Sequence, residues 1–413
     1  MFLNLITTLL LMGNIDAWFL TKITITLSIP VLKFPQKMPM LNHQKNQFGI
    51  IIAQHSEFFI SIEADEKIKN FNFYCLDYSP TGGKIIDFKG ETNIQRNLTA
   101  INECVPVASV SYQIPINVTI TATKWNYLPI FYSYGENKNK TIEDEGKFYD
   151  TIESYGFIEN FYTQMLLTSR DVILLKASNS SLIKTLQKHT DVVRYYIKLL
   201  GENDYNQQSI FLRSNMYQNF ECNSNFTNDW INANTIMEFF NDNYGHLNWC
   251  TLTKIGQFYE IKYFIKDLNI VGNVWRHLFA NLYRKSIKHK ELMVLPVVYS
   301  MTLKQHYFNA IPIQQWTSPL KVHFFKILFN YNNFESIFRE FNRQHLKYSN
   351  LNEFNDIVYN LIEVFLVHQN LNILSHLRRI NLMLMENTSP RWTEDKIIVR
   401  EEIPLDDDFL RWG

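Results

Sequence analysis

The chain has 413 residues, which is enough for two or three domains of ordinary size. Its 40 basic and 40 acidic side chains cancel, which excludes a surface built throughout to coat nucleic acid or an anionic membrane. Hydrophobic residues make up 46% of the chain and glycines number only 13, which excludes global disorder and disfavours glycine-rich phosphate loops.

The amino terminus allows two interpretations. Residues 1–12 are mostly apolar, and their length suits the apolar core of a secretory signal, but no basic residue precedes Lys22. A membrane-spanning helix needs about 20 apolar residues, and Asn14 and Asp16 interrupt the run before that length. Residues 1–20 are therefore either a signal peptide or an apolar segment buried as the first strand or helix.

The four cysteines are too few and too dispersed for a disulfide scaffold, and none forms a C-x-x-C pair. Cys75 and Cys104 are able to pair if the chain is secreted, whereas a cytosolic protein would keep four buried free thiols. Six N-x-S/T sequons carry little weight in a chain so rich in asparagine. They start at Asn97, Asn117, Asn139, Asn179, Asn225 and Asn387.

Residues 48–134 show the pattern of β-strands. Apolar residues alternate with polar ones at 60–64 and again at 114–122, and residues 81–84 supply a turn. This pattern predicts a small β-rich module. The polar and charged segment 135–147 that follows is the best candidate for a linker.

Beyond the linker the apolar period becomes helical. Apolar residues recur at steps of three or four within 182–200, from Trp275 to Leu282, and again after Phe354. Ser318 and Pro319 form a typical helix start. These patterns predict antiparallel helices stacked in pairs.

Familiar catalytic motifs are missing. Neither H-E-x-x-H nor G-x-S-x-G occurs, and no glycine-rich phosphate loop follows a strand. We expect His277 and His323 to be packed or surface residues rather than metal ligands. The aspartates at 406–408 are expected to form a solvated acidic tail. The sequence thus predicts a binding protein that is not an enzyme and uses no cofactor and no metal.

Six short stretches of the helical part occur in a characteristic order. They are N-F-Y-T-Q-M-L at 160–166, H-T-D-V-V-R-Y at 189–195, Y-G-H-L-N at 244–248, Y-F-I-K-D-L at 263–268, N-L at 281–282 and I-P-L-D-D-D-F at 403–409. Together they resemble the nonsense-mediated mRNA decay and telomerase-associated factors of the Est/Smg type. That family joins a 14-3-3-like helical domain to TPR-like hairpins.

The resemblance implies a mostly α fold of stacked antiparallel helical hairpins, preceded by a small β-rich amino-terminal module. The expected division is a signal or buried apolar segment at 1–20, a β-rich module at 48–134, a linker at 135–147, partial 14-3-3-like helices at 148–240 and TPR-like hairpins at 241–413. Whether residues 1–147 belong to the functional protein stays open.

By the same resemblance, Arg194 and Tyr195 bind a phosphoserine or phosphothreonine, and Asp191 orients the arginine. A planar guanidinium engages a phosphate through two hydrogen bonds, so the chemistry fits. The alternative is an ordinary surface arginine paired with an aspartate on an amphipathic helix.

A second expected site involves nucleic acid. The basic residues Lys262, Lys266, Arg284 and Lys285 fall in the hairpin region that the family uses for nucleic-acid contact, and they suggest a basic stripe. The alternative is a solvated lysine face.

The resemblance therefore implies a non-enzymatic phosphopeptide-binding adaptor, located in the cytoplasm or nucleus. Its expected partners are a phosphorylated decay helicase, related adaptor subunits, and RNA or DNA. A telomerase-associated RNA- or DNA-binding factor is one alternative. The other is a secreted or membrane-associated glycoprotein whose β module binds a ligand, which the apolar amino terminus and the sequons favour.

Overall fold

The computed structural model describes a little over three fifths of the chain. The described residues are 21–27, 44–64, 67, 71–79, 83–88, 92–110, 116–133, 142–178, 180–201, 209–214, 231–233, 235–240, 247–259, 274–287, 297–330, 334–347, 354–369, 371–380 and 401–402. The chain divides into two compact units, and each is described by itself. The first unit comprises Met1–Lys33, Met40–Thr190 and Asn206–Thr251, and the second comprises Phe34–Pro39, Asp191–Tyr205 and Leu252–Gly413.

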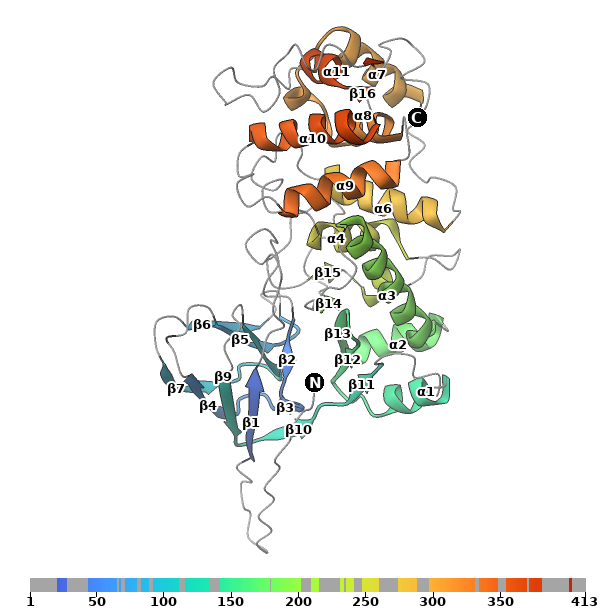
Figure 1. Ribbon diagram of the computed structural model, residues 1–413. Coiled ribbons are helices and arrows are strands. Elements are labelled where there is room, and N and C mark those ends of the chain that lie inside the picture. Colours follow the sequence, from blue (N-terminus) through green and yellow to red (C-terminus); the bar gives the residue numbers. More distant parts are fainter. Residues whose placement is uncertain are drawn as a thin grey trace, which may run out of the picture. The chain divides into compact units, whose positions relative to one another are not determined.

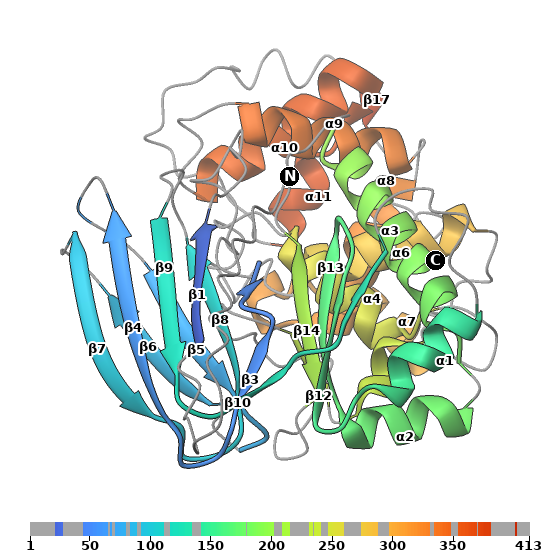
Figure 2. The same ribbon diagram turned by 90° about the horizontal axis from the view of Figure 1, so that it is seen from below.

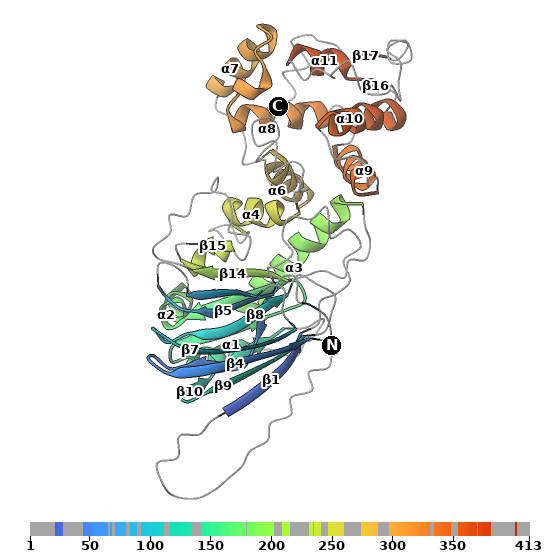
Figure 3. The same cartoon turned by 90° about the vertical axis from the view of Figure 1, so that its left-hand side faces the viewer.

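The first unit begins with two four-stranded antiparallel sheets, seen edge-on in Figure 3. The first sheet has the order β1-β9-β4-β7, and the second has the order β2-β8-β5-β6. Their strands are β1 (Thr21–Leu27), β9 (Ile116–Ala122), β4 (Glu57–Ala64), β7 (Asn93–Thr99), β2 (Asn46–Gln47), β8 (Val105–Val110), β5 (Phe71–Leu76) and β6 (Lys84–Phe88). One core cluster joins the sheets, because alternate apolar residues such as Ile60 and Phe73 point into it.

A third, five-stranded sheet of mixed direction lies on the other face of the second sheet. Its order is β11-β12-β13-β14-β15. The strands are β11 (Ile130–Tyr132), β12 (Tyr155–Glu159), β13 (Thr163–Thr168), β14 (Ile210–Ser214) and β15 (Ile231–Ala233). Tyr74 and Val107 of the second sheet pack with Phe157 and Phe211 of the third in one core cluster.

Short elements complete the first unit. Strands β3 (Ile50–Ile52) and β10 (Trp125–Tyr127) form a two-stranded sheet, and the 3-10 turn η1 (Ile236–Phe239) follows β15. Helices α1 (Ile142–Asp150) and α2 (Ser169–Ser178) lie beside the third sheet, as Figure 2 shows. Asp171 fixes the start of α2, because its buried carboxylate accepts the Thr168 amide and hydroxyl, both at 2.8 Å.

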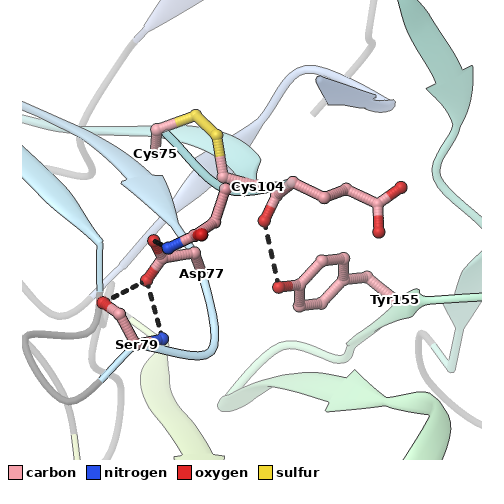
Figure 4. The surroundings of a disulfide bond; sticks show 7 residues. Cys75, Asp77, Ser79, Cys104 and Tyr155 are labelled. Atoms are coloured by element: carbon pink, nitrogen blue, oxygen red, sulfur yellow. Dashed lines mark hydrogen bonds between the residues drawn. A yellow bond between two sulfur atoms is a disulfide. The ribbon is translucent and has the colours of Figure 1, made fainter. Parts of the chain in front are cut away.

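A disulfide between Cys75 and Cys104 braces the second sheet (Figure 4). Cys75 belongs to β5, and Cys104 directly precedes β8. Beside it the Asp77 carboxylate accepts hydrogen bonds from the Ser79 hydroxyl at 2.6 Å and from the Asn102 amide at 3.0 Å. The covalent link and these polar contacts hold the two loops at this end of the sheet together.

The second unit is mainly helical in its described part. Its helices are α3 (Leu182–Leu199) from Asp191 on, α4 (Trp249–Phe258) from Leu252 on, α6 (Val274–Ser286), α7 (Val297–Phe308), α8 (Ser318–Asn330), α9 (Phe334–Lys347), α10 (Phe354–Gln369) and α11 (Leu374–Arg379), with the short turn η2 (Ile313–Gln315) between α7 and α8 (Figure 1). Strands β16 (Leu371–Asn372) and β17 (Glu401–Glu402) pair in parallel. Trp275 is central to the core, where its ring contacts Phe325, Phe338 and Phe341.

The predicted fold class is wrong. The chain is mixed α and β rather than a stack of helical hairpins, because β12, β13, β14 and β15 occupy the segment predicted as 14-3-3-like helices. The stretch 160–166, matched to a family helix, contains a turn and the start of β13. All six residues of β13 are buried, so the strand lacks the alternation that marks a half-exposed strand.

Other predictions have mixed outcomes. The helices predicted within 182–200 and from Trp275 to Leu282 are confirmed as α3 and α6. Residues 142–147 of the expected linker form the start of α1. The apolar segment 1–20 and the aspartates at 406–408 lie outside the described residues. In the described part of the chain, each helix is too short or too polar to cross a membrane.

Candidate functional site in a buried polar helix pair

Helix α4 carries polar side chains on a face that is buried. Asn248 caps its start, since its side-chain oxygen accepts the amide of Cys250 at 2.8 Å. Thr253, Lys254 and Gln257 are all at most 5% exposed. Polar groups are costly to remove from water unless they are hydrogen-bonded, so these side chains are expected to have partners within the protein.

Helix α6 supplies the other half of the site. It buries Arg276, His277, Asn281 and Arg284 together with its apolar residues. Trp275 anchors the helix by donating its indole hydrogen to the side-chain oxygen of Asn342 at 3.1 Å. We call the two helices the α4–α6 pair.

The two helices meet at a glycine. A Cβ placed on Gly256 would lie 2.8 Å from the backbone oxygen of Arg276, so no larger residue fits there without moving α6. The close approach brings the next residue of α4 to the guanidinium, and Nη1 of Arg276 donates to Oε1 of Gln257 at 2.7 Å. This contact holds a charge that is 0% exposed.

The charged side chains of the α4–α6 pair are all basic. Helix α4 contributes Lys254, and α6 contributes Arg276, Arg284 and Lys285, while neither helix contains a carboxylate. Burial, with a further contribution from the charge of Arg276, lowers the pKa of His277 to about 4. His277 is therefore neutral at physiological pH.

The residues predicted to bind a phosphopeptide lie together on α3. Asp191 and Arg194 are exposed, and Tyr195 is half-buried. The Tyr195 hydroxyl donates to Oε2 of Glu335 at 3.1 Å, and Lys198 forms an ion pair with Oε1 of Glu335 at 2.8 Å. Contacts from Lys198 and Tyr195 lower the pKa of Glu335 despite its partial burial, so a carboxylate stands beside Tyr195. Phosphate contacts by these residues stay a prediction.

The residues predicted to contact nucleic acid are not gathered on one described surface. Arg284 is 2% exposed, whereas Lys285 is exposed. Lys262 and Lys266 lie outside the described residues. Nucleic-acid contact by these four residues stays a prediction.

The fold of the chain is similar to the folds of several metallopeptidase structures. No protein-family model and no curated protein matches its sequence. The ZmpB metallopeptidase from Clostridium perfringens is 10% identical, with a TM-score of 0.66 over 94% of this chain and 82% of that chain. The M60 catalytic domain of Clostridium perfringens ZmpC, in complex with the sialyl T antigen, is 12% identical, with a TM-score of 0.61 over 94% and 81%. A functionally unknown conserved protein from Bacillus anthracis strain Ames is 11% identical, with a TM-score of 0.66 over 94% and 81%. At these identities the similarity establishes the fold.

These similarities overturn the resemblance to the Est/Smg-type factors. The fold is that of metallopeptidase catalytic domains and not of 14-3-3-like or TPR-like helical repeats. The functions implied by that resemblance, which are a phosphopeptide-binding adaptor in nonsense-mediated mRNA decay and a telomerase-associated factor, lose their basis. The prediction that the chain is not an enzyme is corrected as well, because the chain shares its fold with catalytic modules.

A metallopeptidase fold raises the question of a zinc site, and the described residues do not fit one. Catalytic zinc takes three protein ligands drawn from histidine, carboxylate and cysteine side chains. No three such residues gather in the part of the chain that the structure describes. In the α4–α6 pair the residues of these types are Cys250, which is disulfide-bonded, and His277, which is buried beside the charge of Arg276.

Sequence reasoning missed the polar face of α4. The segment T-K-I-G-Q at 253–257 contains three polar residues inside an otherwise apolar helix, and a glycine in the middle of that helix. Both features are visible in the sequence, but apolar periodicity alone does not predict that these polar residues are buried. His277 is 6% exposed, so of the two placements expected for it, packed or on the surface, the structure shows the packed one.

Proposed function

We propose that this protein works in an oxidising compartment outside the cytosol and recognises glycosylated polypeptides. The observation that supports recognition most is the shared fold over 94% of the chain with the catalytic domain of ZmpC, which was solved in complex with the sialyl T antigen. The proposal replaces the adaptor hypothesis with a form of the secreted-glycoprotein alternative. Its ligand is a polypeptide that carries a short glycan.

The cysteines support the compartment. Cys75 and Cys104 form a disulfide, and Cys250 is disulfide-bonded too. Disulfides persist in oxidising surroundings and are rare in the cytosol, where thiols are kept reduced. The cytosolic alternative of four free thiols does not agree with these bonds.

Two sequons lie on one surface, which also agrees with secretion. Asn97 of β7 and Asn117 of β9 are both exposed. Each pairs with a residue of the strand between them, Asn97 with Phe59 and Asn117 with Glu63, which are both on the outward face of β4. An outward asparagine in such a sequence is accessible to a glycosylating enzyme.

The test is a titration of the full chain with a peptide that carries the sialyl T antigen and with the same peptide lacking the glycan. We expect calorimetry to show that the glycosylated peptide binds at least about tenfold more tightly, a difference of roughly 1.4 kcal/mol. Equal affinity for both peptides would remove the proposal. A third peptide, with the glycan but a scrambled sequence, separates recognition of the glycan from recognition of the polypeptide.

Peptide-bond hydrolysis is the second candidate function. The observation that favours it is that the neighbours sharing this fold include catalytic domains. Mass spectrometry of the peptides after the titration detects hydrolysis directly. New fragments from the glycosylated peptide alone would establish cleavage in addition to recognition, and intact peptides would leave recognition as the activity.

A further inference from the structure

The polar face of α4 has the residue spacing of a zinc-binding helix. In zincin metallopeptidases the sequence H-E-x-x-H places two zinc-binding histidines four residues apart on one helix face, with the catalytic glutamate directly after the first. In α4 the buried residues Thr253, Lys254 and Gln257 have this spacing. A hydroxyl, an ammonium group and an amide thus have the spacing along α4 that two imidazoles and a carboxylate have along a zincin helix.

We infer that the α4–α6 pair is a metal-independent structural element, in which the hydrogen bond between Gln257 and Arg276 joins the helices and α4 binds no zinc. The inference goes beyond the proposed function, because glycopeptide recognition does not depend on it. It concerns what this chain has in place of a metal centre.

Ligand chemistry is the first argument. Zinc in proteins is bound by thiolate, imidazole and carboxylate groups. Thr253 and Gln257 offer a neutral hydroxyl and a neutral amide. The Oε1 atom of Gln257 already accepts the Arg276 guanidinium at 2.7 Å, so the one carbonyl-type oxygen among the three side chains is engaged.

Charge is the second argument. A divalent cation beside Lys254 and Arg276, both at most 4% exposed, would experience strong repulsion at the low effective dielectric constant of an interior. Burial and, secondly, the charge of Arg276 lower the pKa of His277, so this imidazole is neutral beside that guanidinium.

Packing is the third argument. The backbone of α6 at Arg276 lies so close to Gly256 that a Cβ would approach its oxygen to 2.8 Å. The helices therefore need no bridging ion to meet. Their contact comes from Gly256 of α4 and from the hydrogen bond between Gln257 of α4 and Arg276 of α6.

The test measures zinc in the full chain. The protein is stripped with a chelator, incubated with excess zinc chloride and passed through a desalting column, after which its zinc content and thermal unfolding midpoint are measured. We expect far less than about one zinc per chain and an unfolding midpoint equal to that of the stripped protein, because a ligand that binds only the native state raises the midpoint. If about one zinc per chain is found, two variants show whether the ion is bound at α4.

The variants Thr253→Val and Gln257→Met remove the oxygen atoms at the two positions in α4. Zinc that is retained by the wild type, raises its midpoint and is lost in either folded variant would overturn the inference. Zinc retained equally by both variants would place the ion away from α4 and support it. Thr253→Val changes shape least, so it keeps the test decisive if Gln257→Met fails to fold. Glycopeptide affinity, measured separately, shows whether the proposed function stands or fails independently.

Discussion

Arg276 is a guanidinium removed from water, and its contact with Gln257 offsets part of the cost of burying the charge. Removing the neutral acceptor of a buried charge costs more than the hydrogen bond itself contributes, because the guanidinium loses this acceptor at a place where water does not replace it. The contribution of Gln257 can therefore be measured from the free energy of unfolding of a variant that lacks its side-chain amide.

Gln257→Ala is expected to lower the free energy of unfolding by about 3 kcal/mol. Urea denaturation of the full chain measures it. The matched control is Lys147→Ala, which breaks an exposed ion pair with Glu143 in α1 and should cost at most about 0.5 kcal/mol. Equal small losses in both variants would show that the contact between Gln257 and Arg276 contributes little to stability.

His277 links stability to pH. Burial lowers its pKa from 6.5 to about 4, so the unfolded chain takes up a proton before the folded chain does. Above pH 6.5 the residue has no effect on stability. Between pH 6.5 and pH 4 it makes the fold progressively less stable, by up to about 3 kcal/mol.

Denaturation series at pH 7.5, 6 and 5 are expected to show this loss in the wild type and a smaller loss in His277→Gln, which cannot titrate. The buried His189, whose pKa burial lowers to about 4, adds a similar effect from the first unit, so the variant should keep part of the slope. An unchanged slope in His277→Gln would contradict the assignment.

The helix contact at Gly256 gives a prediction on the scale of two elements. Gly256→Ala places a methyl group 2.8 Å from the backbone of α6 and should destabilise the protein by about 2 kcal/mol. Gly146→Ala is the matched control, because Gly146 lies within α1 and a Cβ there has no neighbour within 4 Å. The control should be neutral or stabilising by up to about 1 kcal/mol. Thermal unfolding compares the two, and equal effects would rule out the close approach.

At the scale of single elements, the sequence predicted those whose apolar residues follow a regular period. The stripes of α3 and α6 have a spacing of three or four because one face of each is buried, and both helices were predictable. Strands β12, β13 and β14 are buried almost throughout, so their apolar runs lack alternation and resemble helix segments. Short motif matches could not correct this, since Asn160 and the residues after it form a turn in place of a helix.

The candidate site was less predictable than the fold. The predicted residues of α3 were placed on the correct helix, but nothing in the sequence indicated that Glu335, 140 residues away, would accept the Tyr195 hydroxyl. The contact between Gln257 and Arg276 spans 19 residues and depends on the space left by Gly256. Periodicity describes a single helix, whereas these contacts join two.

At the scale of the molecule, the disulfide of the first unit should contribute to stability. Cys75 and Cys104 enclose a loop of 29 residues, for which chain entropy gives about 3 to 4 kcal/mol. Cys75→Ala combined with Cys104→Ala is expected to lower the unfolding midpoint of the oxidised protein. Adding a reductant should shift the midpoint of the wild type and shift the double variant less. Equal shifts in both would contradict a structural role for this bond.

We propose for the whole molecule that a metallopeptidase-like fold recognises glycopeptides and that α4 binds no zinc. One measurement tests this most directly: calorimetric titration of the chelator-treated full chain with the sialyl T antigen peptide and with its unglycosylated counterpart. The account predicts that the metal-free protein binds the glycosylated peptide at least about tenfold more tightly. Equal affinities, or discrimination that appears only after zinc is added, would contradict it.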